Sequence, residues 1–175
     1  MTVRDALLGI LTLGPAYGLQ LHHELAERAP HREKTNVGQI YGTLERLSKA
    51  GLVLPAGLSS DGLPLYALTT QGQQVAEEWL DGRNLDFIPA WEDIQDMILI
   101  SHSVSPNSLS ALDRRIRELI ANESGDNTTL SHKAHGHYLT AIREWLNDVR
   151  SAPNQGVKHY AENRTRRGRP KKLVK

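Results

Sequence analysis

Apolar residues recur every three or four positions along most of the chain, and each such run predicts a helix. A first helix is expected over residues 6–13, where Gly14 and Pro15 end it. A second is expected over about residues 18–28, and a third over residues 36–49. Three short helices in this order are typical of a helix-turn-helix.

Two short β-prone runs follow, at residues 52–54 and 65–68. The turn cluster Ser-Ser-Asp-Gly at residues 59–62 separates them, so we expect a hairpin. The sequence Thr-Thr-Gln-Gly at residues 69–72 then starts a fourth helix that runs to Leu80. A helix-turn-helix followed by a two-stranded hairpin predicts a winged helix.

Apolar runs beyond the hairpin predict three more helices, within residues 94–99, 109–120 and 139–149. Ser105 and Pro106 are typical of an N-cap followed by proline at the first helical position. These apolar faces exceed what a winged helix needs for its own core. We therefore expect an antiparallel helix pair that closes on a second copy of the chain, with a monomeric bundle as the alternative.

The helix over residues 36–49 has two contrasting faces. One is apolar, with residues at helical spacing: Val37, Ile40, Leu44 and Leu47. The opposite face is small and polar: Gly38, Gln39, Gly42 and Arg46, with Thr43 at its border. A helix of this kind can lay its polar face in the major groove of duplex DNA.

A capping residue and two glycines mark the same helix. Asn36 suits the N-cap, and Gln39, three residues on, suits the reciprocal position of a capping box. Glycine costs about 1 kcal/mol relative to alanine in a helix interior. Gly38 and Gly42 on an exposed face therefore indicate that another molecule, such as a duplex, approaches the backbone closely.

Three groups of residues occur in a fixed order between residues 5 and 80. They are Leu13-Gly14-Pro15 with Tyr17-Gly18, then Gly38-x-Ile40-Tyr41-x-x-Leu44-x-x-Leu47-x-x-x-Gly51-Leu52-Val53, then Tyr66-x-Leu68-Thr69-x-x-Gly72. This order resembles the PadR family of bacterial transcriptional regulators. The resemblance implies that the third helix enters the major groove, that Tyr41 lies near the DNA backbone, and that the C-terminal helices form a dimer.

The resemblance also sets the expected site residues. DNA contacts are expected from Asn36, Gly38, Gln39, Tyr41, Gly42, Thr43, Arg46 and Lys49. A small apolar effector is implied between the winged helix and the C-terminal helices, with Trp91 as the expected wall, although Trp91 also suits a core position. In one respect the chain departs from the family: its residues 62–65, ahead of Tyr66, lack the usual Arg or Lys.

Charge is unevenly distributed along the chain. Residues 1–80 contain 6 Lys/Arg and 8 Asp/Glu, and residues 81–163 contain 8 and 12. Residues 164–175 contain 7 Lys/Arg and no acidic residue. A mildly acidic body cannot attract DNA by bulk charge, so it needs local positive patches or help from the tail. The absence of cysteine suits a reducing cytoplasm.

The basic tail contains an Arg-Gly-Arg-Pro sequence that resembles the core of an AT-hook. Glycine lets the backbone enter a narrow minor groove, proline keeps the chain extended, and the arginines follow the groove. Minor-groove contacts are therefore expected from Arg166, Arg167, Gly168, Arg169 and Pro170. The alternative is a solvated basic end.

No metal, cofactor or catalytic site is expected. His132, His135 and His137 invite a metal hypothesis, but at about 100° per residue His137 is turned too far from the other two for all three to converge. The sequence contains no phosphate-binding glycine loop, no nucleophile elbow and no motif-placed carboxylate pair. We do not expect an enzyme.

The predicted protein is mainly α and has three parts. They are a winged helix-turn-helix with a two-stranded β-wing over residues 1–81, a helical dimerisation and effector region over residues 82–150, and a basic tail over residues 151–175. The predicted function is a cytoplasmic, nucleoid-associated homodimer that binds a pseudo-palindromic operator and represses transcription until an effector releases it. The alternatives are an architectural DNA-binding protein dominated by its tail, and a winged helix that binds protein.

Overall fold

The computed structural model describes residues 3–123, 129–153 and 156–160. Within these ranges the chain forms seven α-helices, one short 3-10 helix and one two-stranded sheet. In chain order they are α1 (Val3–Leu11), α2 (Gly18–Arg28), η1 (Pro30–Arg32), α3 (Val37–Lys49), β1 (Val53–Leu58), β2 (Pro64–Leu68), α4 (Thr70–Leu80), α5 (Trp91–Val104), α6 (Pro106–Asn122) and α7 (Leu130–Ser151). The predicted fold class, mainly helical with a two-stranded wing, is confirmed.

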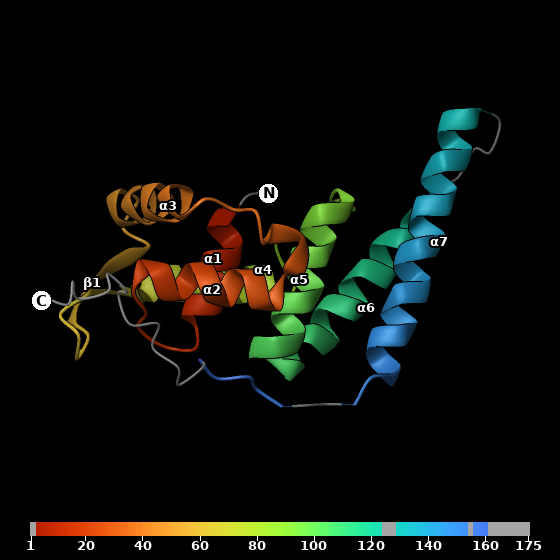
Figure 1. Cartoon of the computed structure of the whole chain (residues 1–175). Helices are drawn as coiled ribbons and strands as arrows, with labels where there is room; N and C mark the ends of the chain where they lie inside the picture. Colours follow the sequence, from red (N-terminus) through yellow and green to blue (C-terminus); the bar gives the residue numbers. More distant parts are fainter. Residues whose placement is uncertain (1–2, 124–128, 154–155, 161–175) are drawn as a thin grey trace, which may run out of the picture.

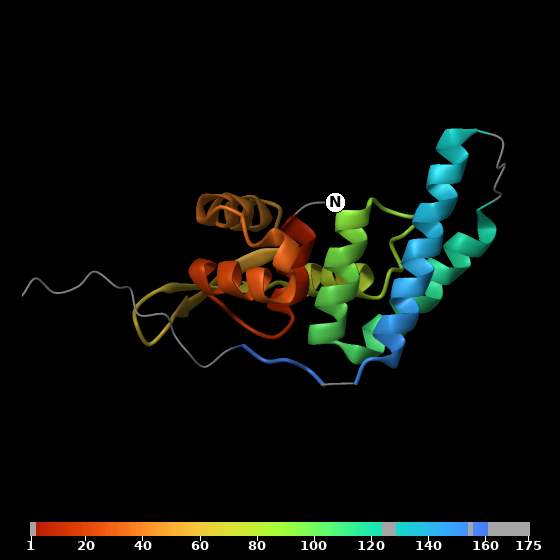
Figure 2. The same cartoon turned by 45° about the vertical axis from the view of Figure 1, so that its right-hand side comes forward.

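The helix α5 occupies the middle of the molecule (Figure 1). Helices α1 to α3 and the hairpin lie on one side of it, and α6 and α7 lie on the other, in both views (Figures 1 and 2). α5 contacts α1, α2 and α4 as well as α6, and α6 contacts α7. The winged part and the C-terminal helical pair are therefore joined through α5 and through a direct contact between α4 and α6.

One continuous apolar core runs through both parts. In the winged part, the fully buried Leu7, Leu21 and Leu44 bring α1, α2 and α3 together. Met97 of α5 and Ile116 of α6 continue the same cluster. Since burying a side chain of this size contributes about 1.5–3 kcal/mol, the apolar stripes of the sequence account for the assembly of these helices.

The wing is an antiparallel hairpin in which Val53 lies opposite Leu68. Its register shifts between Pro55 and Leu58. Gly57, inside this interval, has a φ of 85°, a left-handed conformation that glycine adopts without strain. The shift bends β1 in the way that a β-bulge does.

The predicted turn of the hairpin forms, and a third segment pairs with its base. Gly62 N–H donates to the carbonyl oxygen of Ser59 at 2.9 Å. Ala16, between α1 and α2, exchanges two backbone hydrogen bonds with Tyr66, of 3.0 and 2.9 Å. The wing is thus anchored to the turn that follows α1.

The start of α4 approaches the start of the wing very closely. Thr69 Oγ1 accepts a hydrogen bond from Gly72 N–H at 3.0 Å and so caps α4. A Cβ atom at Gly72 would lie only 1.9 Å from the carbonyl oxygen of Leu52. Glycine is therefore required here by packing.

Helix ends differ from the sequence prediction at some places. α1 ends at Leu11, two residues before the end of its apolar run, and α7 begins at Leu130, well before its run at residues 139–149. Ser105 caps α6 as predicted, with Ser108 N–H donating to its Oγ at 3.4 Å. No helix in the described ranges is both long and apolar enough to cross a membrane.

A segment after α7, within the region that the sequence predicted as a tail, lies against the body of the molecule. Residues 156–160, which we call the C-terminal strap, run back past α5 toward the winged part (Figure 1). Lys158 N–H donates to the carbonyl oxygen of Ser103 at 2.7 Å. The Tyr160 hydroxyl lies 2.8 Å from the carbonyl oxygen of Gly14.

Candidate nucleic-acid interface

The helix α3 is held by its apolar face, which leaves the opposite face to solvent. Ile40, Leu44 and Leu47 are at most 1% exposed and join the core with α1 and α2. Asn36 Oδ1 accepts a hydrogen bond from Gly38 N–H at 2.7 Å, so Asn36 caps the helix as predicted. Among the hydrogen bonds of the described residues, the Asn36 N–H donates none to the Gln39 side chain, so only half of the capping box forms.

The two glycines of α3 differ in their surroundings within the chain. A Cβ atom at Gly42 would meet no atom within 4 Å, and one at Gly38 would meet only Asn36 Oδ1, at 3.1 Å. Alanine would favour the helix by about 1 kcal/mol at such a position. At Gly42, internal packing therefore gives no reason for glycine, and close approach of another molecule does.

Two cations flank the glycines, and both have partners on α3. Lys49 Nζ lies 2.6 Å from Glu45 Oε1, and Arg46 Nη2 donates to Thr43 Oγ1 at 3.0 Å. The hydrogen bond from Lys49 lowers the pKa of Glu45. Because exposed pairs of this kind contribute little stability, a phosphate can compete for Lys49 at small cost.

Tyr41 lies at the edge of the same surface. Its side chain is 42% exposed, and its ring covers the backbone at Gly18, the first residue of α2. A Cβ atom at Gly18 would lie 2.5 Å from Tyr41 Cε1. The glycine at this position therefore allows Tyr41 to stand beside the first turn of α2.

Thr43 is less accessible than the sequence pattern indicated. It is 3% exposed rather than lying on the open surface. It lines a groove of about 530 Å³ between α1 and α3, together with Arg4, Gln39 and Arg46. This groove borders the polar face of α3, so Gln39 and Arg46 are the accessible polar side chains on that flank.

Contacts from α2 and α5 fix the segment that leads into α3. Asp96 of α5 is 2% exposed and accepts hydrogen bonds from Arg32 Nη2 at 2.8 Å and Arg32 Nε at 3.1 Å. His31 Nε2 lies 2.8 Å from the same carboxylate, and His22 Nε2 lies 2.8 Å from the carbonyl oxygen of Thr35. Sequence reasoning missed Asp96, whose signal was an acidic residue inside an apolar helical run.

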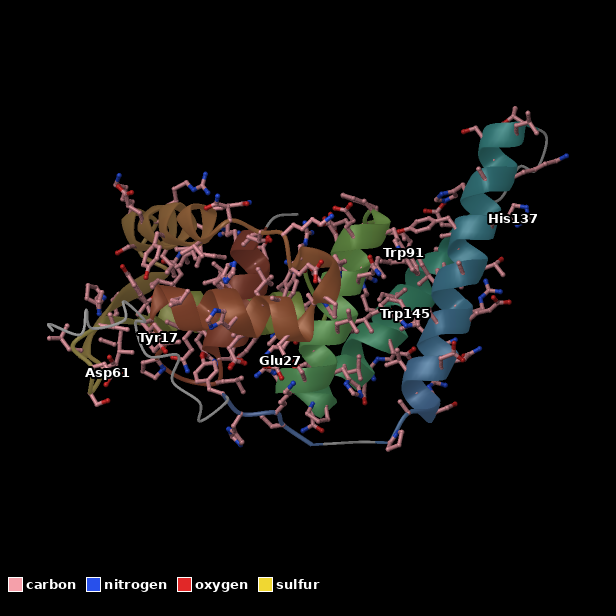
Figure 3. The ribbon with its side chains drawn as sticks, viewed as in Figure 1. Tyr17, Glu27, Asp61, Trp91, His137 and Trp145 are labelled. Atoms are coloured by element: carbon pink, nitrogen blue, oxygen red, sulfur yellow. The ribbon has the colours of Figure 1, made fainter. Side chains whose placement is uncertain are left out.

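Trp91, the expected wall of an effector site, lies at the start of α5 and faces α7 (Figure 3). It is 38% exposed, so it is not a core residue. Its ring centroid lies 5.4 Å from that of Trp145 and 6.3 Å from that of Tyr138. The Tyr138 hydroxyl donates to the carbonyl oxygen of Pro89, and burial raises the pKa of Tyr138. These aromatic rings join α5 to α7.

The remaining predicted site residues lie outside the described ranges. They are Arg166, Arg167, Gly168, Arg169 and Pro170 of the AT-hook-like sequence. Among the residues that the structure describes, no group of three His, Asp or Glu side chains is arranged to hold a metal ion.

The arrangement of α1 to α4 with the β1–β2 hairpin is a winged helix-turn-helix whose third helix presents a polar, glycine-containing face. Residues 7–78 match the model of the transcriptional regulator PadR-like family. The N-terminal part of the chain is therefore similar to a PadR-like domain.

Similarity to a solved structure extends over more of the chain. The structure is a crystal structure of Bacillus subtilis PadR in complex with operator DNA, with 21% sequence identity and a TM-score of 0.44. The alignment covers 86% of this chain and 94% of that one. No curated protein matches the chain.

Proposed function

We propose that the chain is a sequence-specific DNA-binding transcriptional regulator of PadR type. The observation that carries the proposal is the outward face of α3, where space around Gly42 is open and polar side chains flank it. The description of the matching family as transcriptional regulators supports the same function. In this proposal α3 enters the major groove of duplex DNA.

Each residue of the interface has a role in this proposal. Gln39 reads a base edge, and its amide is suited to adenine. Arg46 and Lys49 contact bases or phosphates, and Tyr41 contacts the backbone beside α2. Gly38 and Gly42 allow the duplex to approach, while Asn36 acts through its cap on the helix.

A homodimer would bind two half-sites of a pseudo-palindromic operator. The two copies of α3 must then lie about 34–36 Å apart, one turn of the double helix. The C-terminal helices supply the dimer contact, and occupancy of a promoter represses transcription. A small apolar effector bound near Trp91 favours a dimer with a different separation of the two α3 helices, which releases the operator.

The tail is assigned an auxiliary role. Arg166, Arg167, Gly168, Arg169 and Pro170 bind the minor groove of AT-rich flanks, and the body sets sequence preference. The alternative, an architectural protein dominated by the tail, is favoured by the confinement of excess positive charge to residues 164–175. The protein works in the cytoplasm, at the nucleoid.

The testing experiment is footprinting of the purified chain on the DNA upstream of its own coding region. A protected, pseudo-symmetric site is expected, and excess random DNA should not abolish it. Gly42→Leu should abolish protection because its side chain fills the open space in front of α3. The control is Gln74→Leu, at an exposed position on α4. Equal footprints for the parent and Gly42→Leu would refute the role of α3.

A further inference from the structure

The C-terminal strap crosses from the end of α7 to the winged part of the same chain. Its Lys158 forms backbone contacts on both sides: its N–H donates to Ser103 of α5, and its carbonyl oxygen accepts from Arg28 Nη2 of α2 at 2.7 Å. Lys158 Nζ also lies 2.6 Å from Glu27 Oε1 and lowers the pKa of Glu27. Glu27 lies near the end of α2 that faces the strap (Figure 3).

The strap completes the surroundings of a buried ion pair. The Arg28 side chain is fully buried and its Nη2 lies 2.8 Å from Glu24 Oε2, on the same helix. When the strap leaves, Nη2 loses its hydrogen bond to the carbonyl oxygen of Lys158. Because a hydrogen bond from a charged donor contributes about 1.5–3 kcal/mol, its formation favours the closed strap.

Tyr160 fixes the end of the strap at the root of the wing. Its hydroxyl lies 2.8 Å from the carbonyl oxygen of Gly14 and 3.0 Å from that of Ile10, at the C-terminal end of α1. Burial raises the pKa of Tyr160. Two residues beyond Gly14, Ala16 pairs with Tyr66 of the wing. Tyr160 therefore lies close to the base of β2.

The wing next to this anchor carries no cation of its own. No Lys or Arg occurs between Lys49 and Arg83, an interval that contains the whole hairpin. The charge on the hairpin is negative, with Asp61 near its tip (Figure 3). The wing therefore cannot neutralise phosphates, whereas the segment that begins at Arg164 contains seven Lys and Arg.

We propose that the strap is a latch that delivers the basic segment 164–175 to the duplex beside the wing, in place of the cations that the wing lacks. This inference rests on the proposed function. Arg164 follows Tyr160 by four residues, so an extended chain places it within about 14 Å of the anchor. Without the latch, the nearest helical residue that holds the chain is Ser151, thirteen residues before Arg164.

The latch raises the effective concentration of the basic segment at the DNA. Effective concentration falls as about the −3/2 power of tether length. Release from a tether of four residues to one of thirteen should therefore weaken the contribution of the segment to DNA binding about five- to sixfold. The loss should appear only in chains that contain residues 164–175.

The test combines Tyr160→Ala with deletion of residues 164–175 in a four-variant cycle. Binding is titrated on the footprinted upstream duplex and on a random AT-rich duplex. Tyr160→Ala should weaken binding about five- to sixfold in the full chain and leave the shortened chain unchanged. Exposed His159→Ala is the matched control and should change neither. Equal weakening in both backgrounds, or in neither, would overturn the proposal.

Two further measurements protect the test from a folding artefact. Hydrogen exchange at the Lys158 amide should be protected in the parent and lost in Tyr160→Ala, and retained protection would overturn the role of Tyr160 as the anchor. An insertion of eight Gly/Ser residues between residues 160 and 164 keeps the latch and should also weaken binding about fivefold; full affinity with this insertion would overturn the tether argument. The chain without residues 164–175 tests the proposed function separately. If this chain does not prefer the operator over random DNA, the proposed function fails. The four-variant cycle on AT-rich DNA still tests the latch in that case.

Discussion

At the scale of single residues, two helical glycines illustrate opposite requirements. Gly72 is required from within, because its missing side chain makes room for the carbonyl oxygen of Leu52. Gly42 faces open space and is not required by any contact in the described chain. Glycine is unfavourable in both helices, so the reason for Gly42 must lie outside the chain.

Gly42→Ala should separate stability from DNA binding. The variant should unfold with a free energy up to about 1 kcal/mol higher than the parent, yet bind the operator more weakly because a methyl group faces the duplex. Gly72→Ala, the matched glycine, should lose stability. Thermal unfolding and operator titration measure both effects, and a Gly42→Ala variant with full affinity would contradict the close approach.

Gln39→Ala should weaken operator binding while leaving the fold intact, because Gln39 is exposed beside the groove between α1 and α3. Loss of a good base contact costs about 1–3 kcal/mol. Thr43→Ala should also weaken binding, since it removes the hydroxyl that accepts from Arg46. Thr43→Ser keeps that hydroxyl and serves as the control. Parent-like titrations for both alanine variants would show that this flank of α3 does not contact DNA.

Arg28→Met should strongly destabilise the protein. It removes the buried ion pair between Arg28 and the Glu24 carboxylate, which is 3% exposed, and breaking a buried pair costs about 3–5 kcal/mol. The double variant Glu24→Leu with Arg28→Met should recover much of the loss. Urea unfolding measures both free energies, and a single variant as stable as the parent would mean that water reaches the pair.

At the scale of elements, the sequence predicted helices whose apolar residues recur on one face and whose first residue is a capping side chain. Asn36, Thr69 and Ser105 marked three starts correctly. The first turns of α7 escaped, since residues 130–137 are polar and mostly exposed and form no stripe.

The candidate site was likewise predictable from the sequence only in part. The exposed face of α3 followed from its helical period, but the burial of Thr43 depends on how α1 crosses α3. The strap could not be predicted, because it is held by backbone hydrogen bonds and by the side chains of Lys158 and Tyr160. Contacts of these two kinds produce no periodic pattern in a sequence.

Removal of α6, α7 and everything beyond should produce a monomer. A chain that ends at Ser105 keeps α1 to α5 but lacks the helices assigned to the dimer, so its affinity for a two-half-site operator should fall sharply. A chain that ends at Tyr160 is the control and should remain dimeric. Light scattering measures both, and a dimeric short chain would move the interface to the N-terminal part.

At the scale of the whole molecule, the proposed recognition helix and the excess of positive charge lie in different parts of the chain. The region that contains α3 has a small excess of acidic residues, while residues 164–175 hold seven positive charges. Binding strength can therefore depend on the tail while preference depends on α3. A specific regulator and an architectural protein differ in which of these dominates.

The slope of the logarithm of the DNA-binding constant against the logarithm of salt concentration measures how many phosphates are neutralised. Deletion of residues 164–175 should reduce the magnitude of this slope by about 0.9 for each phosphate that the tail no longer neutralises. Preference for the operator over random DNA should persist, whereas an architectural protein would lose nearly all binding. Arg167→Ala with Arg169→Ala should reproduce most of the loss on AT-rich flanks and little on GC-rich ones, since the guanine amino group obstructs the minor-groove floor. Titrations at several salt concentrations decide between the two.

The strap also has a consequence for how the protein is made. Tyr160 contacts Ile10 across 150 positions of sequence, and Arg28 gains a partner from Lys158. Contacts between such distant positions form late in folding, and domains begin to fold during synthesis from the N-terminus. The buried arginine of the winged helix therefore gains its last hydrogen bond only after residue 158, 130 positions further along, has left the ribosome, and a chain terminated before that residue lacks this contact.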